Sequence, residues 1–386
     1  MRIGIVTEEY PPATGALAEQ VHLFAREARR LGHTVKVLTG AMPDLVRPAP
    51  RASPARAGAT APKTPQPPPA REQDVLRLAR SRPFLREGSL RRMSGGISAA
   101  GAIQSALARE RFDVLHVHEP LSPVLPLLAV HHATGPVVGS FHAPFRPGLL
   151  GRLLRRSQQH TLDRLDAVVA TSKASAASLP ERVRGDLRFI PPGVDVDRLA
   201  RGCRIRRYQD GRINVVCAGG LEGRGGLELL FAAAQRVWRA MELRLLVLGG
   251  GPLVARYRAL VPRGMEDGVV FVDPTPESLP DFLATADVCC ALGTTPRPLL
   301  EAMAAGRPVL ATDIEAHREI VQHGREGELL SATDPGAWSR ALVRLSREPA
   351  RGVAYGERGR NTVQRYAWPG VAREILNLYR AIGVRG

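Results

Sequence analysis

The sequence predicts an α/β protein built from two parallel-sheet, Rossmann-like domains. The chain has 386 residues, which fits two α/β domains of ordinary size better than one. Hydrophobic residues make up 44% of it, enough for two buried cores. Short apolar segments alternate with segments of helical periodicity, and a Pro-Pro-Gly turn at 191–193 divides this alternation into two runs.

The first run begins with a strand at Arg2–Val6, a helix at Ala16–Leu31 and a strand at Thr34–Leu38. The helix stops at Gly32, and glycine directly after a periodic segment is a frequent helix end. The other elements expected in this run are a helix that ends before residue 111, a helix at Leu121–His132, and strands at Asp113–Val117, Val137–Phe141, Ala167–Thr171 and Leu187–Ile190.

The second run restarts the same alternation after residue 212. Its strands are expected at Asn214–Ala218, Leu243–Leu248, Val269–Val272, Val288–Leu292 and Val309–Ala311, with helices between them. Strands that alternate with helices form parallel sheets with right-handed crossovers. In such sheets ligands bind at the carboxyl ends of the strands, so the segments that directly follow the strands are the first places to look for a site.

Residues 41–82 interrupt the first run. They are rich in Pro, Ala and Arg, and three consecutive prolines stand at 67–69. A segment of this composition cannot bury a core. We therefore expect a flexible or polyproline-like insertion here.

The charge of the chain is strongly positive, with 54 Lys and Arg against 37 Asp and Glu and a net charge of +17. Such a protein is drawn to anionic surfaces, which include nucleic acids, anionic lipids and phosphorylated substrates. Aromatic residues are only 5% of the chain and do not interleave with the basic ones, and no recognition motif is present. We therefore expect no specific nucleic-acid partner.

The apolar segments are all too short for a membrane-spanning helix, which needs about 20 residues. The N-terminal segment Met1–Thr7 stops at Glu8 and Glu9, and a secretory signal would need a longer apolar region and a cleavage site. We interpret it as the first strand of a cytoplasmic protein.

Glycines follow several of the predicted strands, among them Gly15 in the first loop, Gly219 and Gly249. Glycine at such a position lets the backbone approach a phosphate and direct its N–H groups to it. Glycine turns are also common in α/β folds, so none of these identifies a phosphate site by itself.

His116 and His118 end one predicted strand, and they share a face of it because side chains alternate along a strand. A metal pair is one interpretation, but no third ligand has a suitable spacing. Polar contact between His118 and a sugar or its leaving group is a second interpretation. A structural role for the histidines is the third, and the spacing alone favours it.

Together these segments resemble the family-4 retaining glycosyltransferases, especially the members that act like phosphatidylinositol mannosyltransferases. The resemblance covers nearly the whole chain except the Pro-rich insertion. Its matching segments are Met1–Val6, Phe112–Pro120, Phe141–His142, Ile190–Asp195, Glu301–Gly306 and Tyr366–Trp368.

The resemblance implies a GT-B fold, in which two Rossmann-like domains face each other across a cleft. It places an acceptor domain at 1–197, with the insertion at 41–82, and a nucleotide-sugar domain at 198–368. A last helix at 369–386 returns to the first domain.

The same resemblance implies roles for individual residues. Glu301 would match the glutamate that binds the ribose hydroxyls, His118 the histidine near the transferred sugar, and Gly15 the glycine loop near the diphosphate. We also count Gly219 and Gly249 among the donor-binding positions. No cofactor or metal is implied, although Asp195-Val196-Asp197 matches a D-x-D pattern that binds metal in some sugar transferases.

The sequence departs from the family at the donor site. Gly220 and Gly225 stand where the family has an arginine and a lysine, and Gly293 stands where it has the first of two glutamates. Arg224 and Arg297 are the basic residues nearest to these positions, and we expect them to be the replacements.

The loop before Glu301 departs as well. In the family its backbone N–H groups receive a phosphate, but Pro296 and Pro298 each remove one such donor. Removing one preorganised donor from a developing anion costs on the order of 10²–10³ in rate.

The predicted function is therefore a retaining, metal-independent transfer of a hexosyl group from a UDP- or GDP-linked sugar to an acceptor hydroxyl on a lipid or glycan. The alternative is a catalytically weakened homologue that acts as a partner or regulatory subunit of another transferase.

Residues 145–156 mix leucines with arginines at helical spacing, and such a segment can lie on an anionic bilayer. In the family this region faces the membrane, which would make a cytoplasmic protein peripheral at the inner membrane face. The alternative is a solvated helix whose leucines pack on the sheet.

Overall fold

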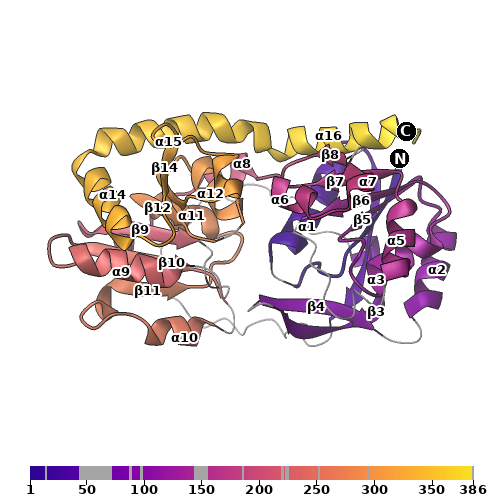
Figure 1. Ribbon diagram of the computed structural model, residues 1–386, viewed down its shortest axis with the longest axis horizontal. Coiled ribbons are helices and arrows are strands. Elements are labelled where there is room, and N and C mark those ends of the chain that lie inside the picture. The colour runs from indigo at the N-terminus through magenta and orange to yellow at the C-terminus, as the bar shows by residue number, and fades with distance from the viewer. Residues whose placement is uncertain are drawn as a thin grey trace.

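The computed structural model describes residues 1–13, 15–42, 72–86, 89–95, 99–142, 155–184, 187–218, 221, 226–250, 253–293 and 295–384. Within these residues the chain forms two sheets, which Figure 1 shows as two lobes. The strand order is β4-β3-β2-β1-β5-β6-β7-β8 in the first sheet and β11-β10-β9-β12-β13-β14 in the second. The α/β fold class with two Rossmann-like sheets is therefore confirmed.

The first sheet is parallel except for the pairing of β3 with β4. Its strands are β1 (Arg2–Val6), β2 (Thr34–Ala41), β3 (Val75–Arg86), β4 (Ser89–Gly95), β5 (Val114–His118), β6 (Val137–Phe141), β7 (Ala167–Ala170) and β8 (Leu187–Phe189). Its helices are α1 (Ala16–Arg30), α2 (Ala99–Glu110), α3 (Leu125–His132), α5 (Arg155–Asp163), α6 (Lys173–Ala177) and α7 (Glu181–Arg184), with a 3₁₀ turn η2 at Glu72–Asp74.

The second sheet is parallel throughout. Its strands are β9 (Ile213–Ala218), β10 (Leu243–Leu248), β11 (Val269–Val272), β12 (Val288–Ala291), β13 (Val309–Thr312) and β14 (Gly327–Leu330). The helices of this half are α8 (Val196–Ala200), α9 (Leu227–Val237), α10 (Val254–Ala259), α11 (Leu279–Thr285), α12 (Arg297–Ala304), α13 (Glu315–Arg318), α14 (Pro335–Arg347), α15 (Pro349–Val363) and α16 (Trp368–Ala381), with 3₁₀ turns η3 at Arg206–Tyr208, η4 at Glu266–Gly268 and η5 at Gln364–Tyr366.

The prediction of a flexible or polyproline-like insertion is wrong for its last residues. Residues 72–82 are ordered as η2 and the first part of β3, which pairs with β2 on one side and β4 on the other. The backbone N–H groups of β4 are held by two acidic side chains that follow β1: Ser94 donates to Glu8 at 2.8 Å and Arg92 donates to Glu9 at 3.3 Å. The rest of the predicted insertion, 43–71, lies outside the described residues.

Each sheet reverses its strand order beside a central strand. The chain builds β2 and β3 on one side of β1 and then places β5 on the other side. It repeats this in the second sheet, where β10 and β11 lie on one side of β9 and β12 on the other. The carboxyl ends of β1, β5, β9 and β12 are therefore the positions at which an open parallel sheet accepts a ligand.

The C-terminal helices run along one side of the molecule from the second lobe to the first, where both chain ends lie (Figure 1). Helix α16 packs against α1 and shares a core with β1 and β2. Its Tyr379 is 0% exposed, and its hydroxyl lies 2.6 Å from Nδ1 of His116. The predicted division after residue 197 falls inside α8, whose Val196 and Leu199 already pack in the core of the second lobe.

None of the helices in the described residues is long and apolar enough to cross a bilayer. The predicted membrane-facing segment 145–156 lies almost entirely outside the described part of the chain, which resumes at the start of α5. Its orientation stays a prediction.

The contact between Tyr379 and His116 predicts a measurable loss of stability. Replacing Tyr379 by Phe keeps the ring but leaves a buried histidine nitrogen without its partner, which should cost about 1–3 kcal/mol of unfolding free energy. Guanidinium denaturation followed by circular dichroism measures this. Tyr355→Phe is the matched control, because Tyr355 is also buried, at 5% exposure, and its hydroxyl makes no hydrogen bond within the described residues. Equal losses of unfolding free energy in both variants would contradict a stabilising hydrogen bond between Tyr379 and His116.

Candidate functional site

Three histidines gather at the carboxyl end of β5. The rings of His116 and His118 stack with their centroids 4.5 Å apart, which confirms that they share one face of the strand. Nδ1 of His118 lies 2.8 Å from Nε2 of His142, which directly follows β6. His116 is held on both nitrogens, by Tyr379 and by Ser140. Nε2 of His118 is buried and has no hydrogen-bond partner in the described residues.

Burial keeps these rings neutral. It lowers the pKa of His116 to about 3 and that of His142 to about 4, both from the ordinary 6.5. It also lowers the pKa of His118 well below 6.5, and the neighbouring rings of His116 and His142 add to the effect. A neutral His118 offers a hydrogen bond to a hydroxyl group, but it carries no charge with which to neutralise a phosphate.

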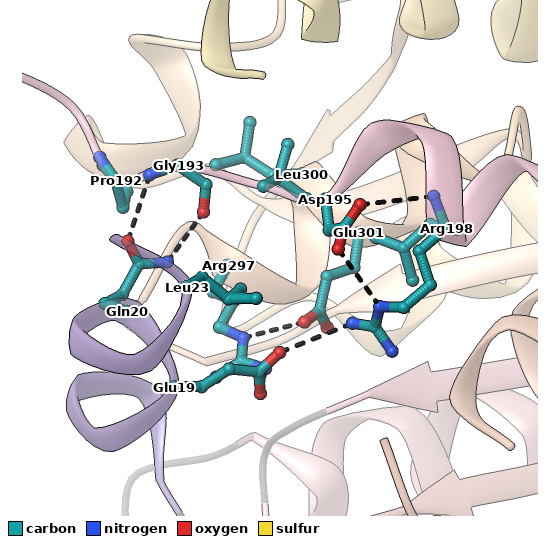
Figure 2. Close-up of a pocket in the computed structure, with 12 residues that line it drawn as sticks. Glu19, Gln20, Leu23, Pro192, Gly193, Asp195, Arg198, Arg297, Leu300 and Glu301 are labelled. Atoms are coloured by element: carbon teal, nitrogen blue, oxygen red, sulfur yellow. Dashed lines mark hydrogen bonds and ion pairs between the residues drawn. The ribbon is translucent and has the colours of Figure 1, made fainter. Parts of the chain in front are cut away.

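A pocket lies between the two sheets, and Figure 2 shows it. Helix α1 of the first lobe forms one wall, the segment 192–199 forms a second, and α12 of the second lobe closes it. Gln20 joins α1 to the segment through two hydrogen bonds with Gly193: its amide donates to the carbonyl at 2.7 Å and its carbonyl accepts from the N–H at 3.1 Å.

Arg297 and Glu301 meet in this pocket. Arg297 is the first residue of α12, and Glu301 lies one turn later on the same face, because residues four apart on a helix are neighbours. Nε of Arg297 donates to Oε1 of Glu301 at 2.7 Å. The other side of the guanidinium pairs with Glu19 of α1. Two predicted donor-site residues are thus brought together, and a third residue that was not predicted joins them.

The other predicted residues are distributed as follows. Gly15 directly precedes α1, with a φ of 141° that favours glycine. Gly249 follows β10 with a φ of 142°, but its N–H already donates to the carbonyl of Val272 at 2.8 Å. His118 and Gly249 do not line the pocket. Gly219, Arg224, Gly220 and Gly225 lie outside the described residues.

Asp195 of the D-x-D pattern has a structural role. Its side chain caps α8 by accepting from the N–H of Arg198 at 3.3 Å, and it pairs with Arg26 of α1 at 2.7 Å. The described residues contain no group of three or more side chains suited to hold a metal ion.

Sequence reasoning missed two residues near these sites, Glu19 and Glu8, and named a third, His142, only as part of a segment that matches the family. Glu19 lies in the first turn of the helix that follows β1, so its position after a carboxyl strand end was the available signal. His142 had the same signal after β6. Glu8 is 7% exposed, and burial raises its pKa to about 7 from 4.5 although Ser94 and Leu125 donate to it. No sequence pattern indicates that partnership.

Comparison with known families agrees with this arrangement. A model described as "Glycosyltransferase Family 4" matches residues 17–198, and one described as "Glycosyl transferases group 1" matches residues 212–348. Together they leave only the first residues, a short connection and the C-terminal helices unmatched. The chain therefore consists of these two glycosyltransferase domains, one of each family, and its fold is GT-B.

Among curated proteins the chain is similar over its whole length to phosphatidyl-myo-inositol mannosyltransferases. It is 28% identical to those of Mycobacterium leprae and Mycobacterium tuberculosis, and each alignment covers 100% of this chain and 98% of the relative. Solved structures with the same fold include sucrose-phosphate synthase from Thermosynechococcus elongatus, with a TM-score of 0.72, 19% identity and coverage of 99% and 98% of the two chains. Another is Anabaena Alr3699/HepE with UDP-glucose, with a TM-score of 0.72, 14% identity and coverage of 99% and 100%.

The buried histidines predict how stability depends on pH. In the unfolded chain both histidines are protonated below pH 6.5. In the folded protein His142 is protonated only near pH 4 and His116 only near pH 3, so the free energy of unfolding decreases as the pH falls below 6.5. Glu8 opposes this, because its raised pKa adds stability below pH 4.5 that is lost as the pH rises through 7.

His116→Gln isolates one of these contributions. It should reduce the slope of unfolding free energy against pH between 4 and 6 by about 1.4 kcal/mol per pH unit. Denaturation curves across that range measure the slope. Tyr379→Phe, which touches the same ring, should lower stability at every pH and leave the slope alone. A slope unchanged in His116→Gln would contradict the burial argument.

Proposed function

We propose that this protein is a retaining glycosyltransferase that moves a hexosyl group from a nucleotide-sugar to an acceptor hydroxyl without a metal ion. The observation that carries the proposal is the pair of Arg297 and Glu301 on the helix that follows β12, in a pocket between two Rossmann-like sheets. A carboxylate suited to ribose hydroxyls and a guanidinium suited to a phosphate stand together at a strand switch point.

The relatives' names support a particular donor and acceptor. The full-length relatives are phosphatidyl-myo-inositol mannosyltransferases. A "GDP-mannose-dependent alpha-(1-6)-phosphatidylinositol monomannoside mannosyltransferase" of Mycobacterium tuberculosis is 31% identical over half of this chain. We therefore propose GDP-mannose as the first donor to test and an inositol lipid as the first acceptor.

In the proposed reaction the bond between the anomeric carbon and the diphosphate breaks on the face at which the acceptor oxygen attacks. The acceptor proton passes to the departing phosphate oxygen, and the diphosphate leaves with the bonding electron pair. Arg297 stabilises the charge that develops on the diphosphate. Glu301 holds the ribose, and the neutral His118 donates to or accepts from a sugar hydroxyl through Nε2.

A weakened homologue is the second candidate function. Gly293 carries no side chain where a glutamate would touch the sugar, and Pro296 and Pro298 flank Arg297 at the start of α12. The first turn of this helix therefore offers fewer N–H groups to a phosphate than an ordinary helix does. Such a protein would keep the fold and act as the partner or regulator of an active transferase.

The first test is donor turnover by the purified protein, with GDP- and UDP-sugars, beside the variant Glu301→Ala. Loss of a carboxylate that accepts hydrogen bonds from the ribose should weaken nucleotide binding about 10- to 100-fold. Glu357→Ala, an exposed change on α15, is the control. The absence of both turnover and nucleotide binding in the wild-type protein would refute the enzyme proposal and favour the partner role.

Membrane contact through 145–156 is proposed separately, as the route to a lipid acceptor. Sedimentation with vesicles that contain anionic phospholipid should carry the protein into the pellet at low salt and release it at high salt, because attraction between arginines and headgroups is screened. Neutral vesicles are the control. Protein that stays in the supernatant with both kinds of vesicle at low salt would exclude this contact.

A further inference from the structure

Glu19 connects α1 of the first lobe to α8 and α12 of the second inside the pocket. It belongs to α1 of the first lobe, and each of its carboxylate oxygens meets an arginine of the opposite wall (Figure 2). Oε2 pairs with Nη2 of Arg297, and Oε1 lies 3.4 Å from Nη2 of Arg198. One acidic side chain therefore engages two guanidinium groups, which is how a phosphate is commonly bound.

The charges around Glu19 cancel. The described side chains in this network are three carboxylates, from Glu19, Asp195 and Glu301, and three guanidinium groups, from Arg26, Arg198 and Arg297. A neutral network has no positive surplus with which to attract a diphosphate. Without Glu19 the same network would carry one positive charge.

The network is shielded from water enough for this balance to matter. The Glu301 side chain is 8% exposed, Arg297 is 20% exposed and Glu19 is 27% exposed. Burial lowers the pKa of Arg297, but the carboxylates of Glu301 and Glu19 outweigh it and raise the pKa above its usual value. The guanidinium is thus permanently charged, and it already pairs with two carboxylates.

We infer that Glu19 is an internal anion that occupies the place of the donor's diphosphate on Arg297 and Arg198. This inference rests on the proposed function of the pocket and adds a positioning residue to it. A nucleotide-sugar binds by displacing the carboxylate and taking over its two arginines. A diphosphate is able to do this because it carries at least two negative charges, whereas a neutral sugar brings no charge to the exchange.

The exchange also links ligand binding to the position of the lobes. Because Glu19 lies on α1 and its partners lie on α8 and α12, its release removes two contacts between the lobes. The remaining described contacts of this wall, from Gln20 to Gly193 and from Arg26 to Asp195, stay in place.

The experiment is calorimetric titration of the whole protein with GDP and with UDP at low ionic strength. Glu19→Gln keeps the shape of the side chain and removes its charge, so it should bind the diphosphates about fivefold more tightly than the wild type, the size expected for partly exposed ion pairs. Glu348→Gln makes the same change of charge far from the pocket, where Glu348 pairs with Arg351 at 2.9 Å, and it should bind as the wild type does.

A double-mutant cycle identifies the arginine that is involved. In the Arg297→Gln background, the change Glu19→Gln should give a clearly smaller gain in affinity, because the guanidinium for which Glu19 and the diphosphate compete is absent. Thermal melting of each variant verifies that it is folded. A gain of the same size in both backgrounds would show that Glu19 does not act through Arg297 and would overturn the inference.

The remaining outcomes separate this inference from the function on which it rests. If the wild type binds GDP or UDP and Glu19→Gln binds equally or more weakly, the inference is wrong and the donor site stands. If neither protein binds either diphosphate, both the donor site and the internal anion are wrong.

Discussion

The direction of the strands fixes where the chemistry of this protein can occur. In each sheet the chain adds strands first on one side of a central strand and then on the other. In the first lobe β2 and β5 flank β1, and in the second lobe β10 and β12 flank β9. Side chains that follow β1 and β12 therefore meet between the lobes, where Glu19 pairs with Arg297. His118 ends β5, Glu19 lies on the helix after β1, and Arg297 and Glu301 lie on the helix after β12. Each lobe supplies only part of this set.

The two lobes contribute different electrostatics. The histidines after β5 and β6 are buried and neutral, so they offer hydrogen bonds and no charge. The charged residues that line the pocket belong to the ionic network around α12, whose charges balance when Arg26 is counted with them. The net charge of +17 is therefore a property of the whole chain and gives no surplus to the described part of the pocket. Within the described residues of this network, positive charge for a diphosphate has to come from a change of partners.

The sequence predicted the alternating elements well because each carries its own periodicity. It failed where pairing across the chain decides the structure. The strand β3 contains four arginines and follows a proline-rich segment, so its sequence does not predict a strand. It forms one because β2 and β4 pair with it and because acidic side chains accept hydrogen bonds from β4. The strand β14 was not predicted, because its sequence Gly-Glu-Leu-Leu begins with a glycine and a charged residue and lacks the continuous apolar run of the other short strands. Glu301 was predicted from the family resemblance and Arg297 from its place in the loop. The role of Glu19 depends on its contacts with arginines of the other lobe, which the sequence does not show.

The same network bears on both proposed functions. In this network Glu301 and Arg297 are paired with each other, so a diphosphate has to compete with carboxylates for the guanidinium. An enzyme has to undo this arrangement at every turnover, and the energy for it must come from the diphosphate. A regulatory homologue has no such need, and for it the closed network would be the working state. The two functions therefore differ in whether a diphosphate outcompetes one carboxylate. Pro296 and Pro298 lack N–H groups, which weakens the binding of a diphosphate at the start of α12. Arg198 offers the diphosphate a second guanidinium, which strengthens its binding.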